Sequence, residues 1–156
     1  MPKNCDSWEA LTEVVQQRCA TILDKSVAPI AKDIVRKHIE TDIYGAYTPK
    51  ENGWVSSDGT PTTYKRRRLL LKRGAIYHKF SAADEIMVTS NVTASPAIVN
   101  GWSFRNRYPG AFLKLLETGN MGIWHGGFPR PAIGNAQKEI DKSSQIASVI
   151  RKELNK

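Results

Sequence analysis

Side chains that could do chemistry are scattered along this sequence, and their spacing matches no common active site. The three histidines, His38, His78 and His125, lie far apart and outside any metal-ligand pattern such as H-E-x-x-H. The sequence contains no G-x-S-x-G, Walker A or G-x-G-x-x-G motif. A fold could still bring His78, Glu117 and His125 together, but an exposed or capping role is the more ordinary one for a histidine. We therefore expect no catalytic residue, no metal and no cofactor, and a protein that is not an enzyme.

A block of positive charge is the strongest functional signal. Residues 63–79 read TYKRRRLLLKRGAIYHK, without an acid, in a chain of 156 residues with net charge +8. Such a block suits phosphates, which lysine and arginine bind in a salt-dependent and sequence-independent way. It also suits an acidic protein partner, because arginine forms bidentate pairs with carboxylates. Only 8% of residues are aromatic, and no stacking array lies between the charges. The residues expected at a subunit or partner interface are Arg66, Arg67, Arg68, Lys72 and Arg73.

Apolar spacing predicts helices at both ends of the chain. Apolar residues recur every three or four positions over residues 8–39, after good N-cap residues at positions 6–7. Pro29 interrupts this pattern, so it either kinks one helix or lies in the first turn of a second helix. A last amphipathic helix is predicted to begin at Pro131 and to reach Leu154.

The middle of the chain predicts strands and loops. Residues 76–80 and 85–92 are predicted to form a hairpin, and the second of these segments alternates with a period of two. The leucines at 69–71 predict a short buried turn with charged flanks. Residues 45–63 are rich in Gly, Pro, Asn and Asp and predict a long exposed loop. The apolar run 111–117 fits a helix or a strand.

Helices at both ends with strands between them predict an α+β fold. In this fold the N-terminal helices and a C-terminal helix pack on a small, mainly antiparallel sheet, with exposed loops at 45–63 and 117–130. The length suits one domain, residues 1–156, that needs no disulfide, so Cys5 and Cys19 are expected to be reduced thiols. No apolar run approaches the roughly 18 residues of a membrane span, so no membrane partner is expected.

The order of several short motifs resembles the tail-completion, or tail-component, proteins of long-tailed bacteriophages. The motifs are DIYGAYTPK (42–50), TYKRRRLL (63–70), LLETGN (115–120) and FPRPAIGNA (128–136). In that family the chain similarly runs through a Tyr-x-Pro loop, a Tyr-x-Arg-x-x-x-Leu-Leu segment, an apolar stretch closed by Glu-x-Gly, and an Arg-Pro pair that opens the last helix. Here the loop is long, and the phenylalanine that usually follows Arg-Pro is displaced to Phe128.

The resemblance implies a role for the irregular segment LLETGNMGIWHGGFPRPAI, residues 115–133. Glu117 and Arg130 match the family's motifs, and a charge-assisted bond between them would close the base of the segment and position the last helix. The span between them would then expose apolar groups of the kind that anchor one subunit in another. These interface residues are Met121, Ile123, Trp124 and Phe128, with the alternative that Trp124 folds into its own core.

The resemblance also implies a function. Proteins of this family act structurally and join the proximal end of the tail to the connector under the capsid, commonly as a closed ring. We therefore expect a ring of six or twelve copies in the neck or upper tail of the virion, made in the host cytoplasm. The implied partners are head connector or stopper proteins and tail terminator or tail-tube proteins, with DNA passing through the bore. The alternative is a basic nucleic-acid-binding protein that acts in packaging or regulation.

Overall fold

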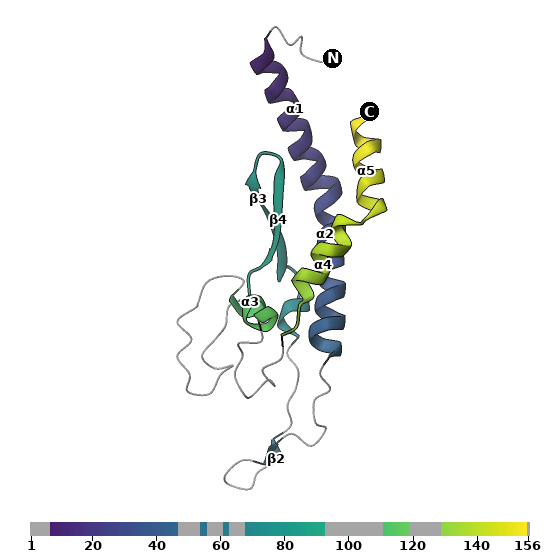
Figure 1. Ribbon diagram of the computed structural model, residues 1–156. Helices are drawn as coiled ribbons and strands as arrows, with labels where there is room; N and C mark the ends of the chain where they lie inside the picture. Colours follow the sequence, from purple (N-terminus) through teal and green to yellow (C-terminus); the bar gives the residue numbers. More distant parts are fainter. Residues whose placement is uncertain are drawn as a thin grey trace.

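The computed structural model describes residues 7–46, 54–55, 61–62, 68–92, 111–118 and 129–155. Within them the predicted α+β fold is confirmed, and the described part is elongated along one long helix (Figure 1). In chain order the elements are α1 (Trp8–Ile22), η1 (Leu23–Val27), α2 (Ala28–His38), η2 (Ile39–Gly45), β1 (Trp54–Val55), β2 (Pro61–Thr62), η3 (Leu69–Leu71), β3 (Ile76–Ala82), β4 (Glu85–Ser90), α3 (Ala111–Thr118), α4 (Ala132–Asp141) and α5 (Ser144–Leu154).

The long helix runs through α1, η1, α2 and η2. Near Pro29 its hydrogen-bond pattern changes, but the helix is not broken. Proline has no N–H to donate to the carbonyl one turn earlier. Just before it, η1 adopts π-helical hydrogen bonds, and the N–H of Ala28 donates to the carbonyl of Leu23, five residues back. Pro29 therefore lies in the first turn of α2, which is the second of the two predicted arrangements.

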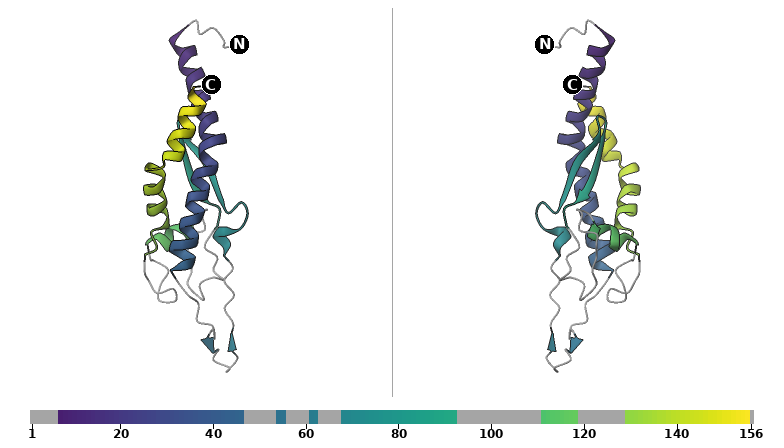
Figure 2. Two further views of the ribbon diagram at one scale, coloured as in Figure 1. Left: turned by 90° about the vertical axis from the view of Figure 1, so that its right-hand side faces the viewer. Right: turned by 90° about the vertical axis from the view of Figure 1, so that its left-hand side faces the viewer.

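Two further layers flank the long helix. The predicted hairpin is confirmed as β3 and β4, which pair antiparallel with Ile76 opposite Ser90 and Phe80 opposite Ile86. The hairpin lies along one side of the long helix, and α4 and α5 lie along another (Figures 1 and 2). β3 continues to Ala82 through an irregularity after Phe80, so the turn is shorter than the pattern predicts.

The hydrophobic core surrounds α2 and η2. Their buried side chains cluster with residues of η3, β3, α3 and α4: Val35, Ile39, Ile43, Leu70, Ile76, Leu113, Leu116, Ala132 and Ala136. The predicted buried turn at Leu69–Leu71 is confirmed as a 3-10 helix in which Leu70 is fully buried, and its N–H donates to the hydroxyl of Tyr44 at 3.3 Å. A second cluster joins Ile22, Val27 and Ile146, and so ties α5 to the end of α1.

The prediction of a single helix from Pro131 to Leu154 is wrong, because the C-terminal segment forms two helices. α4 ends at Asp141 and α5 begins at Ser144. Between them the backbone of Ser143 is extended, and its hydroxyl oxygen accepts the N–H of Ile146 at 3.2 Å. A serine side chain can replace the hydrogen bonds of a helix start, so it opens a new helix where apolar periodicity alone continues the old one.

The boundaries of the predicted loops also differ from the structure. Helix η2 extends to Gly45, and inside the predicted loop 45–63 the short strands β1 and β2 pair, with Trp54 opposite Thr62. The apolar run 111–117 is helical, and α3 reaches Thr118, past the start of the predicted loop 117–130. Most of both loops lies outside the described residues.

The N-cap of α5 gives a first prediction. Replacing Ser143 with alanine removes the acceptor for the Ile146 N–H, so the free energy of unfolding should fall by about 1 kcal/mol. The matched control is Ser144→Ala, because Ser144 is the exposed neighbour inside the helix. Denaturant unfolding of both variants measures the difference, and equal effects would contradict the capping role.

Candidate interaction surface

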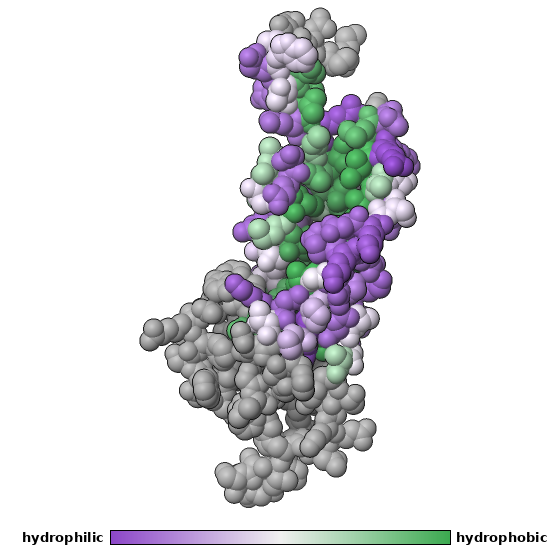
Figure 3. Space-filling view, in the orientation of Figure 1, coloured by the Kyte–Doolittle hydropathy of each residue, from purple (hydrophilic) through white to green (hydrophobic). Residues whose placement is uncertain are grey.

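The N-terminal half of α1 exposes its apolar face, although the rest of the long helix packs against the hairpin as predicted. Within α1 only Ile22, in the last turn, is buried. Trp8 is 81% exposed and Val15 is 51% exposed, and Leu11 and Val14 are also exposed. This half of α1 extends beyond the end of α5 (Figure 1), and apolar surface continues along it in the space-filling view (Figure 3). Amphipathic spacing shows that a helix has an apolar face, but it does not show whether the chain itself covers that face.

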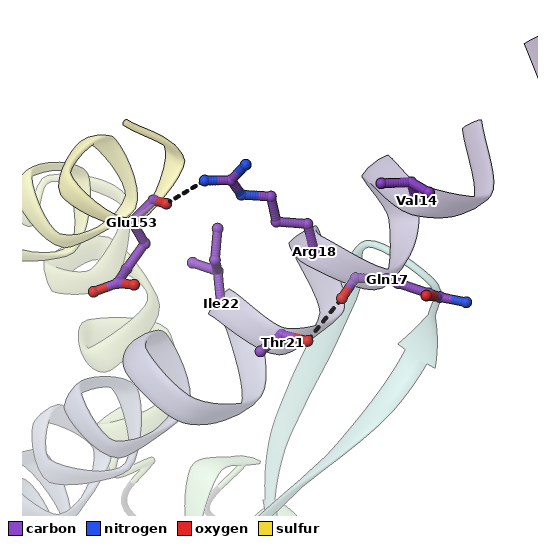
Figure 4. A pocket seen from close by; sticks show the side chains of 6 residues that line it. All are labelled: Val14, Gln17, Arg18, Thr21, Ile22 and Glu153. Carbon is purple, nitrogen blue, oxygen red and sulfur yellow. Dashed lines mark hydrogen bonds between the residues drawn. The ribbon is translucent and has the colours of Figure 1, made fainter. Parts of the chain in front are cut away.

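Where α1 passes the end of α5, the two helices border an open groove of about 390 Å³ (Figure 4). Its lining consists of Val14, Gln17, Arg18, Thr21, Ile22 and Glu153. Arg18 Nη2 donates to the carbonyl oxygens of Glu153 and Leu154, at 3.0 and 3.2 Å. The last carbonyls of a helix lack partners within the helix, so a cation at this position stabilises the C-terminal end of α5. Leu154, in the last turn of α5, is itself 49% exposed.

Three of the basic residues predicted at an interface are described, and all three are exposed around η3. Arg68 has a left-handed backbone, with φ 41°, at the entrance to η3. Its Nη1 lies 3.7 Å from Oε1 of Glu40, and because both side chains are mostly exposed this pair adds little stability. Lys72 and Arg73 follow on the other side of η3. The predicted interface residues that lie outside the described residues are Arg66, Arg67, Met121, Ile123, Trp124 and Phe128.

Glu117 closes the base of the irregular segment through the backbone of α4. Its carboxylate oxygens accept the N–H groups of Ile133 and Gly134, each at 2.9 Å. These N–H groups start a helix and have no partner within it, and the carboxylate also interacts favourably with the positive end of α4. A Cβ at position 134 would lie 3.3 Å from Glu117 Oε1, so glycine leaves room for the carboxylate. Beside them, the Arg130 N–H donates to the Leu116 carbonyl at 3.0 Å. The bond between the side chains of Glu117 and Arg130 stays a prediction.

A polar cluster around His38 joins the long helix to α4. Nδ1 of His38 lies 2.9 Å from Oδ2 of Asp42, and Nε2 lies 2.9 Å from Oε2 of Glu139. Because carboxylates face both ring nitrogens, both contacts are hydrogen bonds when the imidazole carries a proton on each nitrogen. Lys37 Nζ also donates to Glu139, at 2.9 Å, and Asn135 Nδ2 donates to Asp42 at 2.9 Å.

The two carboxylates of this cluster favour their charged forms. Burial acts to raise the pKa of Asp42, but hydrogen bonds from Asn135, Thr41 and His38 together lower it. Hydrogen bonds from Lys37 and His38 lower the pKa of Glu139. The spacing of the histidines gave no indication of this cluster, because Glu139 lies about a hundred positions from His38 along the chain.

The remaining histidine that is described also contacts a carboxylate. Nε2 of His78, on β3, lies 2.7 Å from Oδ1 of Asp24, on η1, and this contact ties the hairpin to the long helix. The sequence left open that the fold brings His78, Glu117 and His125 together around a metal. His78 and Glu117 contact different partners, and His125 lies outside the described residues. Among the residues that the structure describes, no three His, Cys, Asp or Glu side chains form a group that could hold a metal ion.

The fold and this surface define a helix-rich α+β protein with an exposed apolar helix and an exposed basic turn. No helix in the described ranges is long and apolar enough to cross a membrane. In a comparison with protein families, the YomN family matches residues 7–156. The chain therefore belongs to the YomN family, and it is phage-associated. No curated protein and no solved structure matches the chain.

The contacts of Glu117 predict a measurable loss of stability. Replacing Glu117 with alanine leaves two partly buried N–H groups of α4 without an acceptor, so the free energy of unfolding should fall by about 1–3 kcal/mol. Lys114→Ala, at an exposed position of the same helix, is the matched control.

Denaturant unfolding of these variants measures that loss, and it also tests the predicted bond between Glu117 and Arg130. Arg130→Ala and the double variant complete a double-mutant cycle, and a coupling of more than about 0.5 kcal/mol is expected if the two side chains bind each other. Additive effects would contradict the pair.

The cluster around His38 predicts a loss of stability in acid. The pKa values of Asp42 and Glu139 are lower in the folded chain than their usual values of 3.8 and 4.5, so on acidification the unfolded chain takes up protons first. Their contribution is therefore complete above about pH 5 and is lost as the pH falls through the folded pKa values. Denaturant unfolding is measured at a series of pH values from about 5 downward. The free energy of unfolding should depend less on pH in the double variant Asp42→Asn, Glu139→Gln than in the wild type. An unchanged profile would mean that these carboxylates do not cause the acid sensitivity.

Proposed function

We propose that this chain is a non-enzymatic structural protein of the phage particle. In this proposal it lies in the neck or upper tail, where a ring of six or twelve copies joins the tail to the head connector. Membership of a phage-associated family supports a role in the phage, and the order of the short motifs supports this position in the particle. Its partners are the connector or stopper on one side and the tail terminator or tail-tube protein on the other.

The exposed apolar face of α1 is the observation that carries the proposal. A structural subunit acts through surfaces that its own fold leaves uncovered, and grouped exposed apolar side chains mark sites of protein contact. Trp8 is the most exposed of these side chains, and tryptophan is among the residues that contribute most to binding at interfaces. A ring needs contacts between two different patches that repeat until they close. The apolar face of α1 offers one patch, and the basic turn at η3, which is far from α1 in the sequence, offers the other.

The net charge of +8 suits a ring through which DNA passes. The exposed cations Arg68, Lys72 and Arg73 would face either the phosphates in the bore or an acidic neighbour, and both interactions weaken with added salt.

Deletion of the gene from the phage tests the proposal. We expect DNA-filled heads and separate tails by electron microscopy, and restored joining when the purified protein is added to the lysate. The purified protein should form closed rings of uniform size under negative stain. Addition of the same amount of heat-unfolded protein is the control.

Two results would overturn the structural role. Normal joined particles after the deletion are one, and absence of the chain from purified virions by mass spectrometry is the other. If, in addition, the protein binds random duplex DNA with an affinity that falls steeply with salt, the nucleic-acid-binding alternative replaces the proposal.

A further inference from the structure

Five residues of α1 follow the spacing of a helix–helix contact. Trp8, Leu11, Val15, Arg18 and Ile22 are separated alternately by three and four positions, as in the seam of a coiled coil. We call these residues the α1 seam.

The C-terminal end of the α1 seam, with Arg18 and Ile22, is paired within the chain. The N-terminal end, with Trp8, Leu11 and Val15, is exposed, and we call it the upper seam. Ile22 clusters with Ile146 of α5, and Arg18 binds the last carbonyls of α5. The N-terminal end of α1 extends beyond α5 (Figure 1). Toward this end, the described elements leave Trp8 and Val15 more than half exposed. The upper seam therefore has the pattern of a helix contact, and no helix in the described part of the chain covers it.

We propose that α1 of a second copy of this chain covers the upper seam, with the two helices antiparallel. The two-fold axis passes at the level of Glu13. Leu11 then faces Val15 of the partner subunit, and Arg18 faces Trp8 of the partner subunit. Each copy thus supplies a helix that covers the exposed seam of the other.

The groove beside Arg18 favours the antiparallel arrangement. Val14 and Ile22 line it beside Arg18, so it offers an indole ring both apolar side chains and a cation (Figure 4). The partner's Trp8 reaches this groove only when the helices run in opposite directions, and there it can stack on the guanidinium of Arg18. In a parallel pair at the same level, the two Trp8 side chains would meet each other and both grooves would stay open.

Charge also fits this arrangement. In the antiparallel pair the first turn of the partner's α1 lies beside the last turn of α5. The first turn of α1 carries Glu9, and the last turn of α5 carries Arg151 and Lys152. At 100° per residue, Glu9 and Glu13 point away from the α1 seam, so pairing does not bring the carboxylates of the two helices together.

The apolar area is sufficient for a specific contact. The exposed parts of Trp8, Leu11, Val14, Val15 and Leu154 from two copies amount to on the order of 1,000 Å², close to the lower size of specific protein interfaces. This contact does not rest on the proposed position in the neck. A two-fold contact closes no ring by itself, so it is additional to the contacts of a ring and gives an even number of copies.

Site-specific cross-linking tests the register. In a background carrying Cys5→Ala and Cys19→Ala, chains with Leu11→Cys are mixed with chains with Val15→Cys, and a short bis-maleimide is added. We expect a linked two-chain product that is stronger in the mixture than with either chain alone. Trp8→Cys is the control, because in the antiparallel pair its two copies are about 15 Å apart along the helix axis and should not link. Strong linkage at position 8 without linkage between positions 11 and 15 would overturn the antiparallel pair.

The mass in solution gives an independent test. Light scattering at tens of micromolar chain concentration should show that Val15→Glu lowers the mass at least twofold, while Gln16→Glu, which adds the same charge outside the α1 seam, keeps the wild-type mass. Both positions are exposed in the single chain, so circular dichroism should show the same helix content in both variants. A wild-type protein with the mass of one chain, or two variants that both keep the wild-type mass, would overturn the proposal.

Discussion

The accommodation of Pro29 inside the long helix is the constraint on which the rest of the structure depends. The π-helical turn η1 supplies the Ala28 N–H to Leu23, so α1 and α2 stay in one line despite the missing donor of the proline. The hairpin contacts this helix on one side, and α4 and α5 contact it on another. A break at Pro29 would separate the cluster around Ile22 from the core around Ile39.

Polar contacts fasten each outer element to the long helix. Asp24 contacts His78 of the hairpin, His38 contacts Glu139 of α4, and Arg18 binds the carbonyl end of α5. In the first two contacts a carboxylate meets a histidine, and in the third an arginine donates to backbone carbonyls. Hydrogen bonds that involve a charged group are stronger than those between neutral groups. They set where each outer element lies along the helix, which the less directional apolar contacts do not do alone.

The end of α5 at Leu154 separates the paired and exposed parts of α1. Ile22, in the last turn of α1, contributes to the core, whereas Trp8 and Val15, nearer the N-terminus of α1, remain exposed. A chain of a phage-associated family with such a surface is expected to work in an assembly, because an exposed apolar stripe lowers its free energy when a neighbour covers it. The same apolar spacing thus stabilises the fold at one end of the helix and offers a contact at the other.

The amino-acid sequence by itself determined much of the local structure, but not the break between α4 and α5. Apolar periodicity predicted the N-terminal helices and the hairpin, and the leucines at 69–71 predicted a buried turn, because a repeat of burial along the chain reflects the geometry of each element. Only the tertiary structure decided that Glu117 caps α4, that His38 meets Glu139, and that the apolar face of α1 stays uncovered. These features depend on where separate helices end and meet in space, and no local pattern carries that information.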